Sequence, residues 1–197
     1  MLKLGNRQGF TVVELLVVIV VIAILASVSV VAYGGVQTRA ENSKTLAGID
    51  QFGKALQIYK ARNDGKYPLT GGGFQFGCIA ESGTCGNMDG TTNAECVGLG
   101  VSGISATLNT AMKTVINTIP AVSDQTMQCQ NKNVKGALYV NYGTTYIPAG
   151  DPNVYILYFL KGDQPCSTPA GSKPSNLGDF RTYYPSGATR CVILFEA

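Results

Sequence analysis

The chain has 197 residues, of which 45% are hydrophobic and only 14% are charged, and it contains six cysteines but no histidine. Average globular domains are about 25% charged, so this composition indicates a membrane segment or an unusually uncharged soluble part. The absence of histidine excludes catalytic triads and zinc sites that need imidazole. The formal net charge of +3 also limits what the chain can attract through charge alone.

The first forty residues combine a short basic segment with a long uncharged one. Lys3 and Arg7 precede the apolar run, and no formal charge occurs between Glu14 and Arg39. As a helix, Leu15–Tyr33 would span about 28 Å, close to the ~30 Å hydrocarbon core of a bilayer. The basic residues predict a cytoplasmic N-terminus, with the rest of the chain across the membrane.

Three interpretations compete for this segment. A secretory signal needs small residues at a cleavage site after the apolar run, which Ser27-Val28-Ser29 supplies only weakly. A simple signal anchor explains the apolar run but not Glu14, because an ionisable group at membrane depth costs about 2.5–3.5 kcal/mol. The third interpretation rests on the residues that surround Glu14.

Those residues read Gly9-Phe10-Thr11-Val12-Val13-Glu14, between a basic leader and the apolar run. This pattern resembles the N-terminus of type IV pilins and pseudopilins. The resemblance implies that a prepilin peptidase removes the leader, residues 1–9, by cutting between Gly9 and Phe10, and that Phe10 is then N-methylated. Loss of the leader lowers the formal charge from +3 to about +1, which predicts no polyanion-binding surface.

The resemblance also gives Glu14 a role in assembly, where the glutamate of one subunit meets the N-terminal amine of its neighbour. A charged amine among apolar helices needs a counter-charge, because unpaired buried charges are costly. Residues 10–33 would occupy membrane lipid before assembly and the filament core afterwards. The implied partners are further copies of the chain, prepilin peptidase, an inner-membrane assembly platform and a cytoplasmic assembly ATPase.

Amphipathic spacing continues beyond Gly35 and predicts a single helix over residues 10–62, with 34–62 as its amphipathic half. The turn residues Asn63-Asp64-Gly65 are expected to end it. Residues 63–197 should then form the exported head. Its expected parts are a loop region at 69–103, a short helix at about 104–119, and strands within about 137–160 and 190–195.

The expected fold class is α+β, a long N-terminal helix packed on a small antiparallel sheet of three or four strands, as in type IV pilins. Val154–Leu160 is apolar on both faces and is the predicted central strand. All six cysteines follow the membrane segment, and their even number favours disulfides over a metal site. Their spacing leaves the pairing open; the resemblance implies Cys166–Cys191. The other four cysteines are Cys78, Cys85, Cys96 and Cys129.

Three further patterns have ordinary structural interpretations. Gly98–Gly103 matches the GxGxxG of dinucleotide sites, but no hydrophobic strand precedes it. Residues 87–95 offer oxygen ligands without the twelve-position pattern of a calcium loop. Late tyrosines near Lys132 and Arg190 suit stacking on single-stranded DNA, although core packing is the commoner use of tyrosine on strands. We therefore expect no catalytic residue, no metal and no cofactor, with nucleic acid as the less favoured partner.

The function favoured by the resemblance is a structural, non-enzymatic pilin subunit of an extracellular type IV pilus that serves adhesion, twitching motility or DNA uptake. One alternative is a pseudopilin or minor pilin of a type II secretion or competence system. Another is a membrane-anchored extracytoplasmic binding module that never polymerises. All three share a single pass through the cytoplasmic membrane, a cytoplasmic N-terminus and an exported head.

Overall fold

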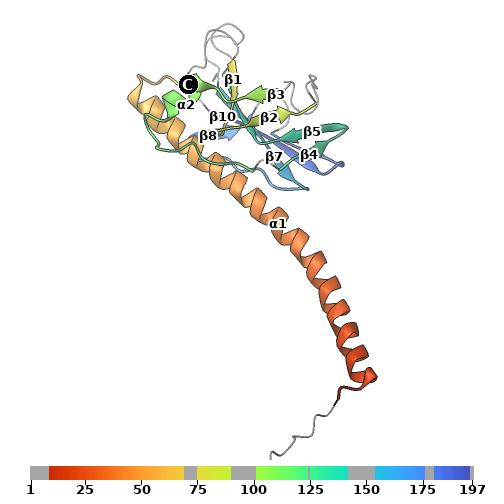
Figure 1. Cartoon of the computed structure of the whole chain (residues 1–197). Helices are drawn as coiled ribbons and strands as arrows, with labels where there is room; N and C mark the ends of the chain where they lie inside the picture. The colour runs from red at the N-terminus through yellow and green to blue at the C-terminus, as the bar shows by residue number, and fades with distance from the viewer. Residues whose placement is uncertain are drawn as a thin grey trace, which may run out of the picture. The chain divides into compact units, whose positions relative to one another are not determined.

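The computed structural model describes residues 9–68, 75–89, 101–123, 125–141, 154–175 and 180–195. Its contacts divide the chain into two units, Met1–Ala40 and Glu41–Ala197. The helix α1 (Val12–Arg62) contributes to both units. Every other helix and strand that the structure describes belongs to the second unit (Figure 1).

α1 occupies the range that the sequence predicts and ends at the predicted turn. Asp64 and Gly65 have positive φ angles of 51° and 76°. The N–H of Gly65 bonds to the carbonyl of Lys60 at 3.0 Å, which is the six-to-one bond of a Schellman cap. Glycine and aspartate tolerate this left-handed backbone, so the Asp-Gly pair stops the helix.

The larger sheet is antiparallel and has six strands. Its central strand is β7 (Val154–Lys161), which pairs with β6 on one side and β10 on the other. Seven of its eight residues are buried, so the prediction that Val154–Leu160 is central is confirmed. The other strands are β1 (Gln75–Cys78), β6 (Ala137–Asn141), β8 (Ser172–Pro174), β9 (Arg181–Tyr184) and β10 (Ala188–Phe195).

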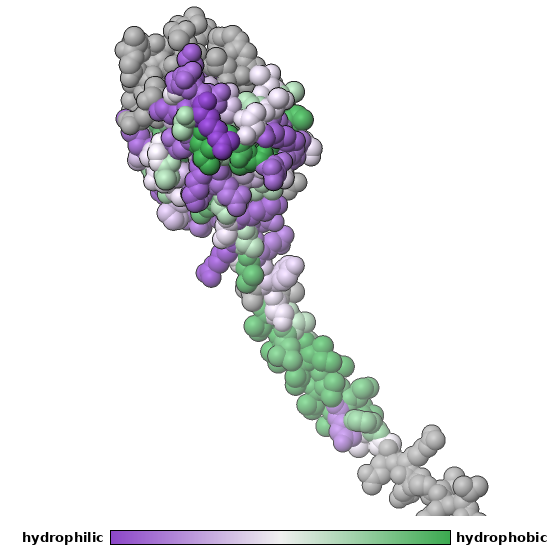
Figure 2. All heavy atoms as spheres, turned by 90° about the vertical axis from the view of Figure 1, so that its left-hand side faces the viewer, coloured by the Kyte–Doolittle hydropathy of each residue, from purple (hydrophilic) through white to green (hydrophobic). Residues whose placement is uncertain are grey.

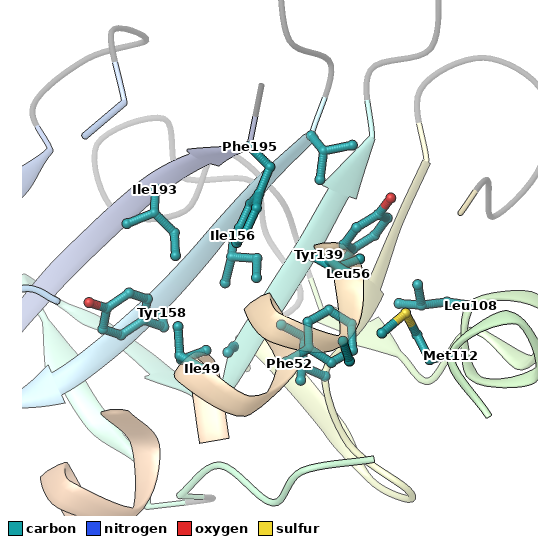
Figure 3. Close-up of a cluster of buried hydrophobic side chains, with 14 of the residues drawn as sticks. Ile49, Phe52, Leu56, Leu108, Met112, Tyr139, Ile156, Tyr158, Ile193 and Phe195 are labelled. Carbon is teal, nitrogen blue, oxygen red and sulfur yellow. The ribbon is translucent and has the colours of Figure 1, made fainter. Parts of the chain in front are cut away.

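Side chains of β7 alternate between two hydrophobic cores. Ile156 and Tyr158 belong to the core under α1, whereas Leu157 and Phe159 belong to a second core on the opposite face. In the first core Phe52 meets Tyr139 edge to face, with ring centroids 6.2 Å apart. Figure 3 shows this core between α1, the sheet and α2. Its labelled members are Ile49, Phe52, Leu56, Leu108, Met112, Tyr139, Ile156, Tyr158, Ile193 and Phe195.

A second, four-stranded sheet covers the other face, and the sequence did not predict it. Its strands are β2 (Thr84–Asn87), β3 (Val101–Gly103), β4 (Met127–Cys129) and β5 (Lys132–Lys135), in the order β3-β2-β5-β4. The predicted loop region 69–103 therefore contains β1, β2 and β3. These strands have three or four residues each and are rich in glycine and cysteine, so they lack the apolar alternation that reveals a strand. The fold is α+β, as predicted.

The helix expected at 104–119 is shorter than its apolar spacing suggested. α2 covers only Ala106–Met112, and the hydroxyl of Ser105 caps it by accepting the N–H of Leu108 at 3.2 Å. The β-branched run Thr114-Val115-Ile116 follows, and such residues favour helix weakly. Val115 and Ile116 nevertheless pack on the first core, which explains their helix-like spacing.

Two disulfides of the second unit are described. Cys166 and Cys191, the pair implied by the resemblance, are bonded, as are Cys78 of β1 and Cys85 of β2. Cys129 of β4 is also disulfide-bonded. No cysteine among the described residues is free. Cys96 and residues 142–153, part of the predicted strand region, lie outside the described residues.

Polar contacts fix the second half of α1 to the sheet. The side-chain amide of buried Asn42 donates to the carbonyl of Lys161 and accepts its N–H, both at 2.9 Å. The hydroxyl of Ser123 donates to Glu41 at 2.7 Å, and the N–H of Ser123 bonds to Thr45 at 3.2 Å. These contacts satisfy backbone groups that burial would otherwise penalise.

Candidate assembly segment at the N-terminus

The predicted cleavage junction, Gly9–Phe10, lies before the first turn of α1. Gly9 is exposed, and a Cβ added to it would meet no atom within 4 Å. The side chain of Phe10 is 85% exposed. The junction is thus an accessible, non-helical peptide bond, which is the form of backbone that proteases cut.

Thr11 and Glu14 start the helix as a capping box. The hydroxyl of Thr11 accepts the N–H of Glu14 at 3.3 Å, while Oε2 of Glu14 accepts the N–H of Thr11 at 2.8 Å. The carbonyl of Thr11 accepts the first helical bond, from Leu15 at 3.3 Å. Reciprocal bonds between the N-cap and the third helical residue satisfy donors that every helix start leaves open. This role of Thr11 was not predicted from the sequence, although the Thr-x-x-Glu spacing signals it.

The capping box uses only part of the Glu14 carboxylate. The hydroxyl of Thr11 also donates to Oε2, at 2.8 Å, so both Thr11 donors meet the same oxygen. Among the residues that the structure describes, Oε1 has no hydrogen-bond partner and no cation pairs with Glu14. The segment therefore holds one uncompensated negative charge and one free acceptor next to the residue that cleavage would make N-terminal.

The first half of α1 exposes apolar side chains on all sides. Each of the large apolar side chains at the positions below is at least 47% exposed. They are Val12, Val13, Leu15, Leu16, Val17, Val18, Ile19, Val20, Val21, Ile22, Ile24, Leu25 and Val28. Figure 2 shows this half of the helix as a continuous hydrophobic surface. Monomeric soluble proteins rarely expose such a surface, so it calls for lipid or for other helices.

The same stretch meets the length and composition of a membrane span. In the described part of the chain, α1 is the one helix long and apolar enough to cross a bilayer. Its two serines are compatible with an apolar surrounding, because their hydroxyls donate to helix carbonyls. Ser27 bonds to Ile24 and Ser29 to Leu25, each at 2.7 Å, which removes the cost of an unsatisfied hydroxyl.

The tyrosines considered for DNA stacking are mostly internal. Tyr158 exchanges hydrogen bonds with the backbone of Ser167, and burial raises the pKa of its phenol to about 12. Tyr183 is 40% exposed. The buried members of the group are Tyr139, Tyr155, Tyr158 and Tyr184. Tyr142 and Tyr146 lie outside the described residues. Packing, the commoner role, therefore accounts for most of them.

The two loop motifs lie largely outside the described residues. Gly103 closes β3, whereas Gly98 and Gly100 are not described. Asp89 has a structural role, since its carboxylate accepts the backbone N–H and the amide of Asn133 at 2.9 and 3.2 Å. The backbone bond is the main cause that lowers the pKa of Asp89. The described residues contain no group of three or more metal-binding side chains.

Comparison with known proteins bears directly on the first part of the chain. The family described as the prokaryotic N-terminal methylation motif matches residues 4–30, which include the Gly9–Phe10 junction and Glu14. The predicted likeness to type IV pilins and pseudopilins is confirmed at the N-terminus.

Seven of the relatives that match the chain carry the name type II secretion system core protein G. The chain is 39% identical over 70 residues to that of Klebsiella michiganensis, 38% over 70 residues to that of Escherichia coli K12, and 36% over 75 residues to that of Vibrio cholerae. These matches cover 36%, 36% and 38% of this chain and 49%, 48% and 51% of the relatives. The chain therefore spans about half the length of these relatives. No solved structure matches it.

Proposed function

We propose that the chain is a structural, non-catalytic subunit that assembles with copies of itself through residues 10–33, and that it serves as a pseudopilin. The observation that carries the proposal is the N-terminal half of α1. It combines an exposed apolar surface with one carboxylate, Glu14, that no cation neutralises among the described residues. Lipid covers the apolar surface but leaves that charge unpaired, whereas a neighbouring copy supplies both cover and a counter-charge.

The proposed sequence of events begins in the membrane. Prepilin peptidase cuts between Gly9 and Phe10, and methylation of Phe10 completes the mature N-terminus. The new amine belongs to Phe10, the residue before Thr11, whose N–H and hydroxyl both bond to one oxygen of Glu14. The free Oε1 of Glu14 accepts a hydrogen bond from the N-terminal amine of an adjacent copy as the apolar helices pack together. A separate cytoplasmic ATPase, acting through an assembly platform, supplies the energy that draws subunits out of lipid.

The relatives favour a pseudopilin over the subunit of an extracellular pilus. Those that match the chain are named as components of type II secretion systems. A pseudopilin remains associated with the cell envelope, whereas a major pilin dominates the filaments that shear releases from the cell surface. The pilus subunit, favoured from the sequence alone, thus becomes the second candidate.

Mass spectrometry of the mature protein tests whether the chain is processed as a prepilin. Mass spectrometry of sheared surface material tests whether it is a pseudopilin or a pilus subunit. We expect an N-terminal peptide that begins with methylated Phe10, and we expect Gly9→Val to keep the leader because the cleavage position no longer has glycine. If the protein is abundant in sheared filaments, it is the subunit of an extracellular pilus and not a pseudopilin. A mature N-terminus elsewhere, for example after Ser29, would contradict processing as a prepilin.

A further inference from the structure

A groove lies between the last turn of α1 and α2, entirely within the second unit. It consists of two adjoining cavities of about 720 and 390 Å³. Both cavities are lined by Tyr59, Asn63, Thr107 and Ala111. Leu108 and Met112 on the inner side of α2 are fully buried in the first core, so the wall that α2 contributes is held in place by packing.

The lining of this groove is rich in hydroxyl groups. Tyr59 is half-buried and contributes an aromatic wall, while Thr107 and Thr110 are exposed on the facing side of α2. Among the described residues, none of these three hydroxyls has a hydrogen-bond partner. Small side chains, Ala106 and Ala111, leave room between the two walls. Free hydroxyls beside one aromatic face suit a ligand that is itself polyhydroxylated and has an apolar ring face.

The rim of the groove carries a small surplus of positive charge. Arg62 and Lys66 line it together with one acid, Asp64, and α2 contributes no charged residue. One guanidinium N–H of Arg62 donates to the carbonyl of Thr114 at 3.3 Å. This bond holds the guanidinium at the turn that follows α2 and leaves its other donors for a ligand. A planar guanidinium matches a carboxylate in two-point contact.

Two simpler explanations account for only part of this arrangement. Basic residues in the last turn stabilise the helix dipole, which explains Lys60 and Arg62 on α1 but not the free hydroxyls on α2. A polyanion site needs many cations, whereas the groove has a net surplus of one and the chain without its leader carries about +1. The chemistry therefore favours one negative charge on a ligand that is otherwise neutral and hydroxylated. Figure 2 views the second unit from the side on which α2 and the end of α1 lie, where hydrophilic residues surround a hydrophobic patch.

We propose that this groove binds an acidic saccharide, a sugar unit that carries one carboxylate. The carboxylate pairs with Arg62, the apolar face of the ring packs on Tyr59, and the sugar hydroxyls bond to Thr107 and Thr110. All of these residues lie in the second unit, so binding requires neither leader cleavage nor assembly. The inference therefore stands or fails independently of the proposed function.

The test is a titration of the full-length protein in detergent with galacturonic acid, a sugar that carries one carboxylate, followed by NMR. Galactose, the same sugar without the carboxylate, serves as the neutral probe, and inorganic phosphate and an oligothymidylate serve as other anions. We expect galacturonic acid to bind at least about tenfold more tightly than each of the other three probes. Binding of galactose, phosphate or the oligonucleotide that is as tight as that of galacturonic acid would overturn the proposal.

Variants with matched controls locate the site. Arg62→Gln should weaken galacturonic acid binding about tenfold, and Thr107→Val should weaken it about three- to tenfold, because each removes one polar contact. Lys54→Gln, on the same helix but paired with Asp50 outside the groove, should leave affinity unchanged, as should Thr118→Val. Binding that survives both groove substitutions, or no binding at about 10 mM ligand, would contradict the assignment.

Discussion

The two halves of α1 belong to one continuous helix but have opposite surroundings. Ile19 in the first half is 58% exposed, whereas Ile49 in the second half is fully buried. The first half is apolar on all sides and has no cover among the described residues. The second half is apolar on one side and packs there against the sheet. The difference shows that backbone conformation follows local sequence, whereas the role of a helix depends on what covers it.

The largest expected contrast comes from the same substitution in each half. Ile49→Ala should lower the free energy of unfolding of the head by about 2–5 kcal/mol, because it leaves a cavity in the first core. Ile19→Ala should change it by less than about 0.5 kcal/mol, since that side chain is exposed. Urea unfolding of the full-length protein in detergent, followed by near-ultraviolet circular dichroism of the tyrosines, measures both. Similar losses of unfolding free energy for the two variants would contradict the view that only the second half of α1 is part of the packed head.

Removal of the Cys166–Cys191 disulfide should also affect only the head. The bond closes a loop with a sequence separation of 25, so replacing both cysteines by serine should cost about 3–4 kcal/mol of unfolding free energy through loop-closure entropy. Insertion of the first half of α1 into membranes should be unchanged. Carbonate extraction of membranes from cells that express the double variant checks insertion, and thermal unfolding checks the loss. A double variant as stable as the parent would contradict the role of this bond.

Two glycine-to-alanine substitutions in α1 should have opposite effects on stability, because Gly35 belongs to the first unit and Gly48 to the second. At Gly48 a Cβ would lie 2.8 Å from the carbonyl oxygen of Ala121, so Gly48→Ala should destabilise the head by about 1–3 kcal/mol. At Gly35 a Cβ would meet nothing within 4 Å, so Gly35→Ala should stabilise the helix locally by about 0.5–1 kcal/mol. Thermal unfolding measures the first effect, and amide hydrogen exchange around Gly35 measures the second. Equal signs would mean that close packing at Gly48 is unimportant.

The smallest expected effect is a pH dependence of the head. The carboxylate of Glu81 accepts one hydrogen bond from the ammonium of Lys113 and one from the backbone N–H of Ile119, each at 2.8 Å. The Lys113 bond and then the Ile119 bond lower the pKa of Glu81 from 4.5. Because the folded pKa lies below the unfolded value, this contribution to stability is complete above about pH 4.5 and is lost as the pH falls through the folded pKa.

The melting temperature, measured between about pH 3 and 6, tests this account. The parent protein should lose more stability towards low pH than Glu81→Gln, whose amide keeps an acceptor for Ile119 but has no charge to lose. Parallel pH profiles for the two proteins would show that Glu81 does not contribute to the pH dependence.

The N-terminal segment was predictable because the residues that identify it are close together in the sequence and have the spacing of the pilin motif. Glycine, phenylalanine, glutamate and an apolar run of span length follow one another, and the resemblance rests on them. The strand Val154–Leu160 was predictable because apolar residues on both faces indicate burial on both faces. The contribution of Thr11 was visible in the Thr-x-x-Glu spacing but depends on a cap geometry that only coordinates show.

The second sheet and the groove could not be predicted in this way. β2, β3, β4 and β5 have three or four residues each. The buried residues of β2, β4 and β5, among them Cys85, Met127 and Val134, belong to the second core together with residues of β7 that are distant in sequence. The groove joins Tyr59 to Thr107, and no periodicity connects two helices separated by a glycine-rich region. Contacts of this kind arise from tertiary packing, which overrides local preference.

The central claim is that copies assemble through the first half of α1 and the Glu14 carboxylate. The direct measurement is the fraction of processed protein recovered in sedimentable filaments for Glu14→Gln, with Asp50→Asn in the second half of the same helix as the control. We predict that Glu14→Gln is inserted, processed at Gly9 and folded in its head, yet yields at least about tenfold less filament, while Asp50→Asn assembles like the parent. Filament yields for Glu14→Gln equal to those of the parent would contradict the account.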